Sequence, residues 1–206
     1  MDTRPEHIYS SDIAFTPAVK AIQSRKGSRG AYQRREEDGA WPERITPDLK
    51  AFIEAQTSVF LATANAEGQP YIQHRGGPAG FLRVMDDRTI GFADFTGNRQ
   101  FITSGNLFEN EKAYLFLIDY VHRRRIKIWG TAHAVEGDAA LTAKLMPAGY
   151  TARAEQIILF TVSAWDSNCA AHIPRRFEAG EVAAMLAERD ERIAVLEAEA
   201  ARRGGP

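Results

Sequence analysis

The sequence predicts a mainly β protein, an antiparallel barrel that is closed or nearly closed and carries helices chiefly at its ends. Three observations lead to this fold class. Apolar strand-like runs crowd residues 57–130, the turns between them are too short to hold a helix, and most helix patterns fall outside this region. The chain has 206 residues and 44% apolar content, which is enough for one substantial core. We therefore expect one main domain.

Residues 1–45 are expected to form an arm with one short helix. The helix signal is Thr16 followed by Pro17, because threonine can cap a first turn and proline fits its start. Residues 26–30 are interpreted as a flexible cationic turn, with a ligand contact as the alternative. The rest of the segment is polar and gives no further helix signal.

The same Thr-Pro pair recurs at Thr46, where the main domain is expected to begin. Leu49, Phe52 and Ile53 follow at helical spacing, which predicts a helix that ends near Gln56. Short apolar runs separated by turn residues then predict antiparallel strands joined as hairpins. The predicted strands are residues 58–64, 70–75, 81–85, 89–93, 112–120, 125–135 and 156–164. Two surface helices are expected among them, one within 98–110 and one capped by Asp138.

The C-terminal part of the chain predicts a long helix over 181–203. Its apolar residues recur at helical spacing, and glutamate and arginine stand four residues apart on its polar side. The apolar stripe comprises Val182, Met185 or Leu186, Ile193, Leu196 and Ala200. We therefore divide the chain into an N-terminal arm at 1–45, a barrel domain at 46–176 and a C-terminal helix at 177–206.

Charge and composition limit the function classes. The 26 basic and 27 acidic residues nearly cancel, so a general attraction to nucleic acid or to an anionic membrane is not expected. The N-terminus has no apolar signal-peptide core, and no apolar run approaches the roughly 18 residues of a membrane span. The single cysteine, Cys169, cannot form an internal disulfide. A cytoplasmic location is the resulting expectation.

The usual enzyme motifs are missing from the sequence. It has no Gly-x-Ser-x-Gly elbow, no Gly-x-Gly-x-x-Gly after a strand and no Walker-type Gly-Lys-Ser/Thr. The histidines also lack the spacing of a zinc motif, so no metal is expected. They are His7, His74, His122, His133 and His172.

One polar segment has the composition of an anion site. Asn98, Arg99 and Gln100 follow a predicted strand at the opening of a predicted helix, where free N–H groups and the helix dipole favour an anion. The arginine offers a planar fork to phosphate oxygens, and the two amides can donate as well. The alternative is a solvated helix start with an ordinary Asn cap.

An ordered set of segments resembles the pyridoxamine 5′-phosphate oxidase-like, FMN-binding split-barrel family, over roughly residues 46–166. The resemblance is nearest to its branch of predicted flavin-nucleotide-binding proteins. It implies an antiparallel six-stranded split barrel and a homodimer that holds two FMN molecules at the subunit interface. The matching segments are 62–64, 68–70, 91–95, 98–100, 106–110, 115–120 and 125–132.

The resemblance also implies roles for individual residues. Arg99 and Gln100 stand where the family has an Arg-Lys phosphate clamp, so one cation is missing, which either weakens FMN binding or shifts the compensation to Arg75 or Arg125. The second strand would line the flavin ring and ribityl chain. Arg125 stands where the oxidase carries a glutamine toward the flavin, and it is expected at the pyrimidine end of the ring or at phosphate. The residues of the strand are Gln73, His74, Arg75 and Gly76, and Asp94 in the matching segment 91–95 joins the cofactor-binding set.

The chain departs from the oxidase after the last strand. The oxidase ends in an Arg-x-His-type signature for its substrate, and this chain has a different segment at 165–175, so vitamin oxidation is not expected. Trp165 is expected as an aromatic neighbour of the flavin across the dimer, with Asn168, His172 and Arg175 as polar lining, and a packed barrel exit is the alternative. Cys169 is interpreted as a buried apolar residue, with a reactive thiolate as the alternative.

The expected function is that of an FMN-dependent oxidoreductase acting on an unidentified small molecule. The protein would supply binding and orientation to the cofactor. No residue is compelled to be a catalytic acid or base, and His74 and His172 are the simplest candidates. The alternatives are a non-catalytic protein that stores, senses or shuttles FMN, and a split barrel that uses haem or F420.

Overall fold

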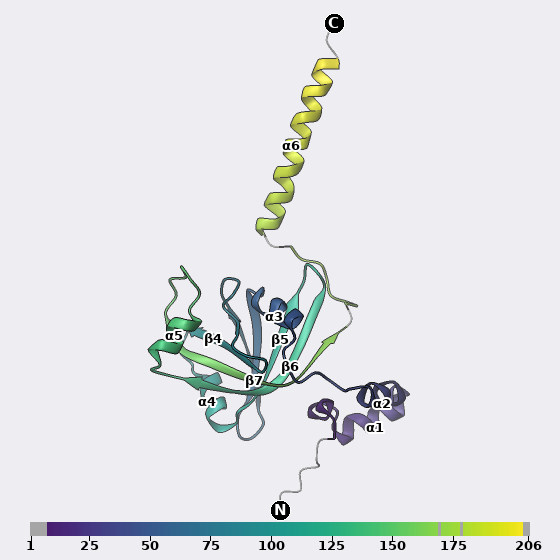
Figure 1. The fold of residues 1–206 in the computed structure, drawn as a ribbon, viewed down its shortest axis with the longest axis vertical. Coiled ribbons are helices and arrows are strands. Elements are labelled where there is room, and N and C mark those ends of the chain that lie inside the picture. The colour runs from purple at the N-terminus through teal and green to yellow at the C-terminus, as the bar shows by residue number, and fades with distance from the viewer. Residues whose placement is uncertain (1–7, 169, 178, 204–206) are drawn as a thin grey trace, which may run out of the picture. The chain divides into compact units, whose positions relative to one another are not determined.

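The structure is a computed structural model that describes residues 8–168, 170–177 and 179–203 (Figure 1). Its elements are η1 (Ser10–Ile13), α1 (Pro17–Lys26), α2 (Arg29–Glu37), α3 (Pro47–Glu54), β1 (Ser58–Ala64), β2 (Pro70–Gly76), β3 (Arg83–Val84), β4 (Thr89–Phe95), α4 (Ile102–Glu109), β5 (Lys112–Asp119), β6 (Arg124–Val135), α5 (Ala139–Leu145), β7 (Ala154–Asn168) and α6 (Ala179–Arg203). The predicted mainly β architecture with helices is confirmed.

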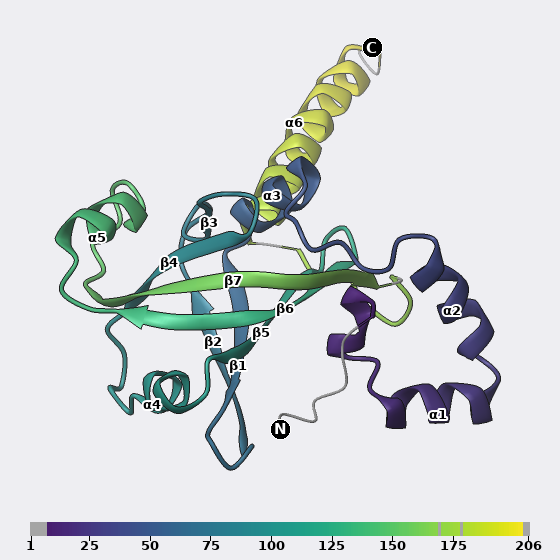
Figure 2. The same ribbon diagram turned by 60° about the horizontal axis from the view of Figure 1, so that its bottom comes forward.

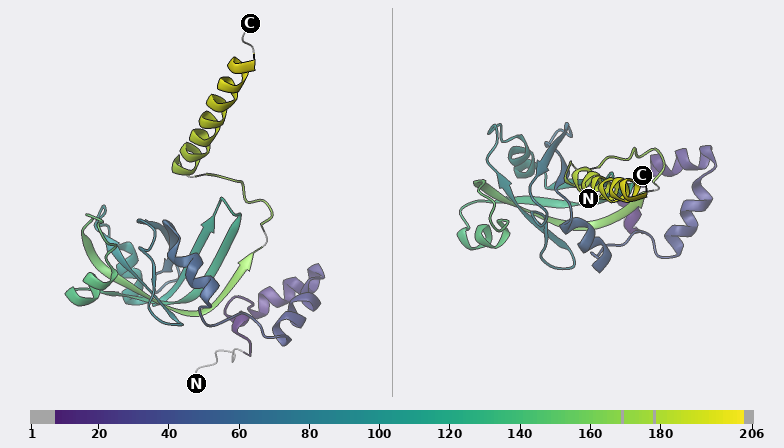
Figure 3. Two further views of the ribbon diagram at one scale, coloured as in Figure 1. Left: turned by 45° about the horizontal axis from the view of Figure 1, so that its top comes forward. Right: turned by 90° about the horizontal axis from the view of Figure 1, so that it is seen from above.

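The strands form one curved sheet in the order β2-β1-β5-β6-β7-β4-β3 (Figures 1 and 3). Its registered strand pairs are antiparallel, as predicted. The described sheet has seven strands, as the residue patterns predicted and one more than the six that the family resemblance implied, and one of them, β3, has only two residues. The predicted strand at 81–85 is this short because Phe81 and Leu82 point into the core and leave only Arg83 and Val84 paired. β2 and β3 are the two edges, so backbone pairing does not close the barrel, but the Arg75 side chain of β2 reaches Asp94 of β4 across the gap.

The main core lies on one face of this sheet and is built by alternation along the strands, and a smaller cluster of Ala93, Leu145 and Ile157 packs α5 against β4 and β7. β1 alternates half-buried and buried residues, with Val59 and Leu61 fully enclosed. The predicted helix at 46–56 is confirmed as α3, and Thr46 caps it by accepting from the Leu49 N–H at 3.2 Å. α3 adds its own buried apolar face, with Ile53 at zero exposure, to the core near β3.

The opposite face of β1, β2 and β5 carries half-buried aromatic side chains. Phe60 in β1 pairs with Phe116 in β5 and with His74 in β2, so the three side chains lie in one row. The next row contains Ile72, which is 58% exposed, and Tyr114. These side chains are neighbours and form one apolar patch, unlike apolar residues scattered singly over a surface.

The two long strands β6 and β7 approach each other unusually closely at Gly130. The register shifts between Trp129 and Gly130, and a Cβ built on this glycine would lie 2.0 Å from the Thr161 carbonyl oxygen. Only a residue without a side chain fits there. The bulge bends the strand pair that forms the long central ribbon in Figure 2.

The N-terminal segment contains more helix than predicted. The predicted helix is α1, capped by Thr16, but residues 29–37 form a second helix, α2, where a loop was expected. Arg29 opens α2 and forms an ion pair with the buried Glu36, which also accepts from Ser11 Oγ at 3.4 Å. The Ser11 contact joins α2 to η1. Figure 2 shows α1 and α2 beside each other.

Trp41 attaches this segment to the barrel. Its ring stacks on Trp129 of β6 at a centroid distance of 4.7 Å and also contacts Phe15. The Lys127 ammonium lies over both tryptophan rings, at 5.7 Å from Trp41 and 5.3 Å from Trp129. Aromatic stacking and a shared cation therefore dock the N-terminal residues onto β6.

The chain divides into two compact units, residues 1–118 with 125–169, and residues 119–124 with 170–206. α6 belongs to the second unit and is the long helix predicted at 181–203. In that unit Arg123 donates to the carbonyl oxygens of Ala170 and Ile173. Within the described residues, no helix is long and apolar enough to span a membrane.

Candidate functional site

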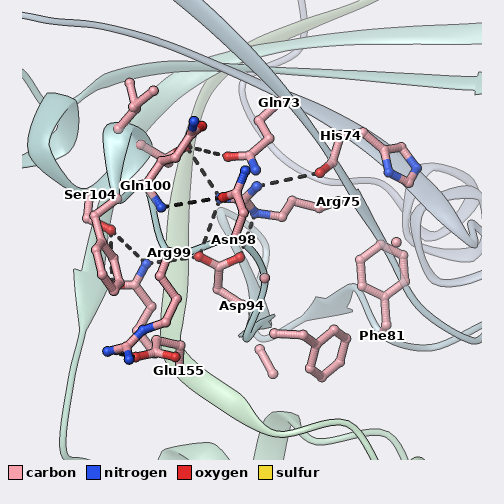
Figure 4. A pocket seen from close by; sticks show the side chains of 18 residues that line it. Gln73, His74, Arg75, Phe81, Asp94, Asn98, Arg99, Gln100, Ser104 and Glu155 are labelled. Atoms are coloured by element: carbon pink, nitrogen blue, oxygen red, sulfur yellow. Dashed lines mark hydrogen bonds and ion pairs between the residues drawn. The ribbon is translucent and has the colours of Figure 1, made fainter.

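A cavity of about 210 Å³ lies where β2, β4 and the start of β7 meet the loop before α4 (Figure 4). Its lining is mostly polar. The residues come from opposite ends of the sheet, because β2 is one edge strand and β4 is the neighbour of the other edge strand, β3. The cavity therefore sits at the mouth of the nearly closed barrel.

A buried ion pair crosses this mouth. The Arg75 Nε atom lies 2.5 Å from Asp94 Oδ1, and both side chains are largely enclosed, at 13% and 11% exposure. Asp94 also accepts from the Gln156 side-chain amide at 2.9 Å. Gln156 is brought next to Asp94 because the two residues are partners in the β4–β7 register. Asp94 thus neutralises Arg75 and ties β2 to β4 and β7.

The first turn of α4 extends this network. The Thr103 hydroxyl accepts from Arg75 at 3.3 Å and donates to Gln73 Oε1 at 3.3 Å. Ser104 and Gln156 are joined by a hydrogen bond of 2.9 Å from the Gln156 amide. α4 is therefore fixed to β2 and β7 by side chains whose polar atoms face the cavity.

The loop at 96–101 has an unusual backbone. Arg99 and Phe101 both adopt left-handed conformations, with φ of 58° and 56°. α4 begins at Ile102, so the prediction that the helix opens at Asn98 is wrong by four residues. Asn98 instead accepts from the Gln100 N–H at 3.4 Å, closing a turn inside the loop. Phe101, the residue that precedes the helix, supplies no side-chain cap to its first N–H groups.

Arg99 leaves the loop as an exposed cation with a partner. Its guanidinium lies 3.2 Å from Glu155 Oε1, and its side chain is 63% exposed. It also lies 5.4 Å from the Phe101 ring centre. Glu155 in turn accepts from the Thr96 hydroxyl at 3.0 Å. The cavity thus holds two arginines and two carboxylates, arranged as one buried pair and one open pair.

Most of the residues predicted to bind a cofactor line this cavity together. They are Gln73, His74, Arg75, Gly76, Asp94, Asn98, Arg99 and Gln100. His74 lies at its edge, where its Nε2 atom is 2.8 Å from the Ser58 hydroxyl and its ring is close to Phe60.

The other predicted residues lie elsewhere on the chain. Arg125 is in β6, opposite Asn168 of β7 in the strand register. The Asn168 side chain and Cys169 lie outside what the structure describes. Trp165 donates its indole N–H to the Arg44 carbonyl oxygen at 2.9 Å and lines a second cavity of about 350 Å³ beside the N-terminal helices. Their assignment to a cofactor stays a prediction.

Sequence reasoning missed several residues of the cavity. Glu155 and Gln156 open the last strand, and only the β4–β7 register places them beside Asp94. Thr103 and Ser104 carried a weak signal, since hydroxyl residues in the first turn of a helix after a polar loop are common anion donors. The missed lining residues include Phe81, Phe101, Thr103, Ser104, Glu155 and Gln156.

The antiparallel nearly closed barrel with a polar cavity at its mouth defines a split-barrel protein. A family model described as pyridoxamine 5′-phosphate oxidase matches residues 45–169, which is more than half of the chain. The chain therefore belongs to the pyridoxamine 5′-phosphate oxidase family. The α6 helix lies outside the matched region.

Solved structures similar to this chain come from several bacteria. HupZ of Group A Streptococcus is 27% identical, with 60% of this chain and 93% of that chain covered and a TM-score of 0.47. An FMN-binding protein from Syntrophomonas wolfei is 14% identical, with 72% and 97% covered and a TM-score of 0.47. HutZ, the haem storage protein of Vibrio cholerae, is 16% identical, with 58% and 89% covered and a TM-score of 0.39. A comparison with curated proteins finds no match to this sequence.

Proposed function

We propose that this chain binds FMN in the cavity between β2, β4 and α4, with the phosphate at the loop 96–101. The observation that carries the proposal is the combination of Arg99 with the start of α4. The arginine is exposed, the helix start lacks a side-chain cap, and two left-handed residues turn the loop backbone. Such backbone turns and helix starts present N–H groups to anions.

The charges of the cavity suit a phosphate that displaces a carboxylate. Arg75 is held by Asp94 in a largely enclosed pair, so it stays a structural cation of the floor. Arg99 is held by Glu155 in an open pair, so its guanidinium can turn to a ligand at little cost. Asn98 and Gln100 add amide donors beside it. The residues present therefore fit a phosphomonoester with one mobile cation.

Gln73, His74 and Gly76 of β2 would then lie along the rest of the cofactor. Bound flavin supplies hydride or electron transfer, and the protein binds, orients and shields it from water. The Gln73 side chain is positioned by Thr103 of α4, which fixes the amide that faces the cavity. On this basis we propose a flavin-dependent oxidoreductase that acts on a small molecule.

A flavin-binding protein without turnover is the second candidate, and one observation favours it. Both carboxylates that line the cavity, Asp94 and Glu155, are engaged with arginines. In the structure, neither carboxylate faces the cavity without a cationic partner. Turnover therefore has to rely on the cofactor itself or on His74.

We also propose that two copies of the chain associate through the outer face of β1, β2 and β5. The support is the row of half-buried apolar side chains around Phe60, with Ile72 largely exposed beside it. Burying such a face against a second copy removes apolar area from water. Light scattering on the purified chain should give the mass of two chains, and a single-chain mass would count against this face.

The experiment that tests the cofactor is an absorption spectrum of the purified protein, followed by turnover assays. Bound FMN gives a flavin spectrum, whereas haem and deazaflavin absorb differently. The oxidoreductase then reduces a quinone or nitro compound with NADH or NADPH. A flavin spectrum without turnover over a panel of acceptors would favour the second candidate, and a protein that takes up no FMN would contradict both.

A further inference from the structure

α6 carries an apolar stripe that its own unit does not bury. The helix spans 25 residues, Ala179–Arg203, and none of them is buried. The exposures of its large apolar side chains include 40% for Val182, 50% for Leu186, 44% for Ile193 and 45% for Leu196. A long helix with a continuous apolar stripe gains stability by packing that stripe against another element.

The spacing of the stripe identifies the kind of partner. Positions 182, 186, 189, 193, 196 and 200, which hold five apolar residues and Arg189, alternate steps of four and three residues. That alternation is the 3.5-residue period of a heptad repeat, in which two helices wind around each other. Leu186, Ile193 and Ala200 occupy the a positions, and Val182, Arg189 and Leu196 occupy the d positions.

The charges beside the seam select a second copy of the same helix. Arg192 falls at a g position and Glu197 at the following e position. In a parallel pair these positions face each other across the seam, so each arginine meets the glutamate of the other copy. In an antiparallel pair e positions face e positions, which would set Asp190 and Glu197 of both copies near each other as like charges.

We propose that α6 pairs with α6 of a second copy as a parallel, in-register, two-stranded coiled coil. Ile193 at a followed by Leu196 at d is the combination that favours two strands. Arg189 at a d position costs stability and fixes the register, as polar seam residues do. A coil of this length is marginal alone, so its association is expected in the full chain, where the barrels add a second contact.

Disulfide trapping in the full chain tests this pairing. Cys169 is the only cysteine, so Cys169→Ser gives a background without thiols. Ile193→Cys places a thiol on the seam of each copy, where a parallel in-register pair brings the two together. Ala198→Cys, one turn away at an f position, is the matched control on the outer face. Under mild oxidation the first variant should form a disulfide-linked dimer at least tenfold faster than the second.

Charge exchange provides a readout that does not depend on a new thiol. Arg192→Glu and Glu197→Arg should each weaken dimerisation about threefold to fivefold, the scale of two exposed ion pairs. The double variant should restore it, because the pair is rebuilt with opposite signs. The proposal would be overturned if residues 193 and 198 were trapped equally, or if a dimeric chain were not trapped at 193. A mass of three chains, or a double variant that dimerises as weakly as the single variants, would also overturn it. None of these readouts involves flavin.

Discussion

The arginine-carboxylate pair at the cavity mouth decides how strongly a phosphate can bind. Arg99 is the exposed cation of the loop, and in the protein alone it is engaged by Glu155 at 3.2 Å. A phosphate must compete with that carboxylate for the same guanidinium. The pair is open to water, so the competition is weak, on the order of 1 kcal/mol or less. In the proposed complex, Glu155 would therefore lower the affinity for FMN without preventing binding.

Glu155→Gln should tighten FMN binding about twofold to fivefold, because it removes the competing charge and keeps the side chain's shape. Fluorescence titration with FMN measures the change. Riboflavin, which lacks the phosphate, serves as the control ligand and should bind equally to both proteins. The explanation fails if riboflavin gains as much as FMN, or if the gain survives in Arg99→Ala/Glu155→Gln.

Gln100→Lys should also tighten FMN binding, because it adds a second cation to the loop beside Arg99. Arg75 is the other cation that could serve the phosphate. It lies in the same cavity, but it is held by Asp94. The same titration at low and moderate salt checks the prediction, and the gain should shrink as salt rises. Unchanged affinity would mean that Arg75 already serves the phosphate.

The loop residues of the site could be predicted from sequence, but their partners could not. Asn98, Arg99 and Gln100 are consecutive, and their donor chemistry is visible in the chain. The Arg75–Asp94 pair joins β2 to β4, which are not neighbours in the sheet, and the Arg99–Glu155 pair joins the loop 96–101 to β7. Local pattern gives no access to those contacts, and without them the cavity looked more cationic than it is.

Side chains connect strands and helices of the barrel that backbone hydrogen bonds do not pair. β2 and β3 are sheet edges, yet Arg75 of β2 reaches Asp94 of β4, and Thr103 of α4 reaches both Gln73 and Arg75. The strands were predicted well because turns and alternation are local. The short β3 was overestimated because Phe81 and Leu82 look like strand residues but serve the core.

Asp94→Asn should destabilise the fold by on the order of 3 kcal/mol, because it leaves the enclosed Arg75 without its counter-charge. Urea unfolding of the protein without ligand measures the loss. Arg75→Gln combined with Asp94→Asn should recover part of that loss, since no unpaired charge remains. A single variant as stable as the parent would show that the pair does not hold β2 to β4.

The second N-terminal helix, α2, was not predicted from the sequence. α2 has no apolar stripe, and it is held by the contact of Glu36 with Ser11 and by that of Tyr32 with Phe15. Such long-range contacts leave no periodic signal, so the segment looked like an arm. Its attachment to the barrel includes the stack of Trp41 on Trp129, the Lys127 ammonium over both rings and contacts of η1 with β7.

Trp41→Ala should therefore release the N-terminal helices while leaving the barrel folded. The expected cost is about 2 kcal/mol, from lost ring contacts and lost burial of a half-buried side chain. Limited proteolysis should show faster cleavage within 17–37, and the FMN affinity should stay unchanged because the cavity lies elsewhere. Unchanged proteolysis would contradict the docking role of Trp41.

The whole molecule combines a family barrel with two attachments that the family match does not include. Residues 45–169 carry the match and the cavity, while the N-terminal helices and α6 lie outside it. We propose that both the barrel face around Phe60 and the heptad seam of α6 contact a second copy of the chain. The two contacts use different residues. A dimer held at two places would keep paired cavities in a fixed assembly at low protein concentration.

The most direct measurement of the central claim is a titration of the full chain and of Arg99→Ala with FMN and with riboflavin. The parent protein should bind FMN more tightly than riboflavin. Arg99→Ala should lose about tenfold to hundredfold in FMN affinity, the scale of a charged hydrogen bond, and little in riboflavin affinity. Equal binding of FMN by both proteins, or no preference for FMN over riboflavin in the full chain, would contradict a phosphate site at this loop.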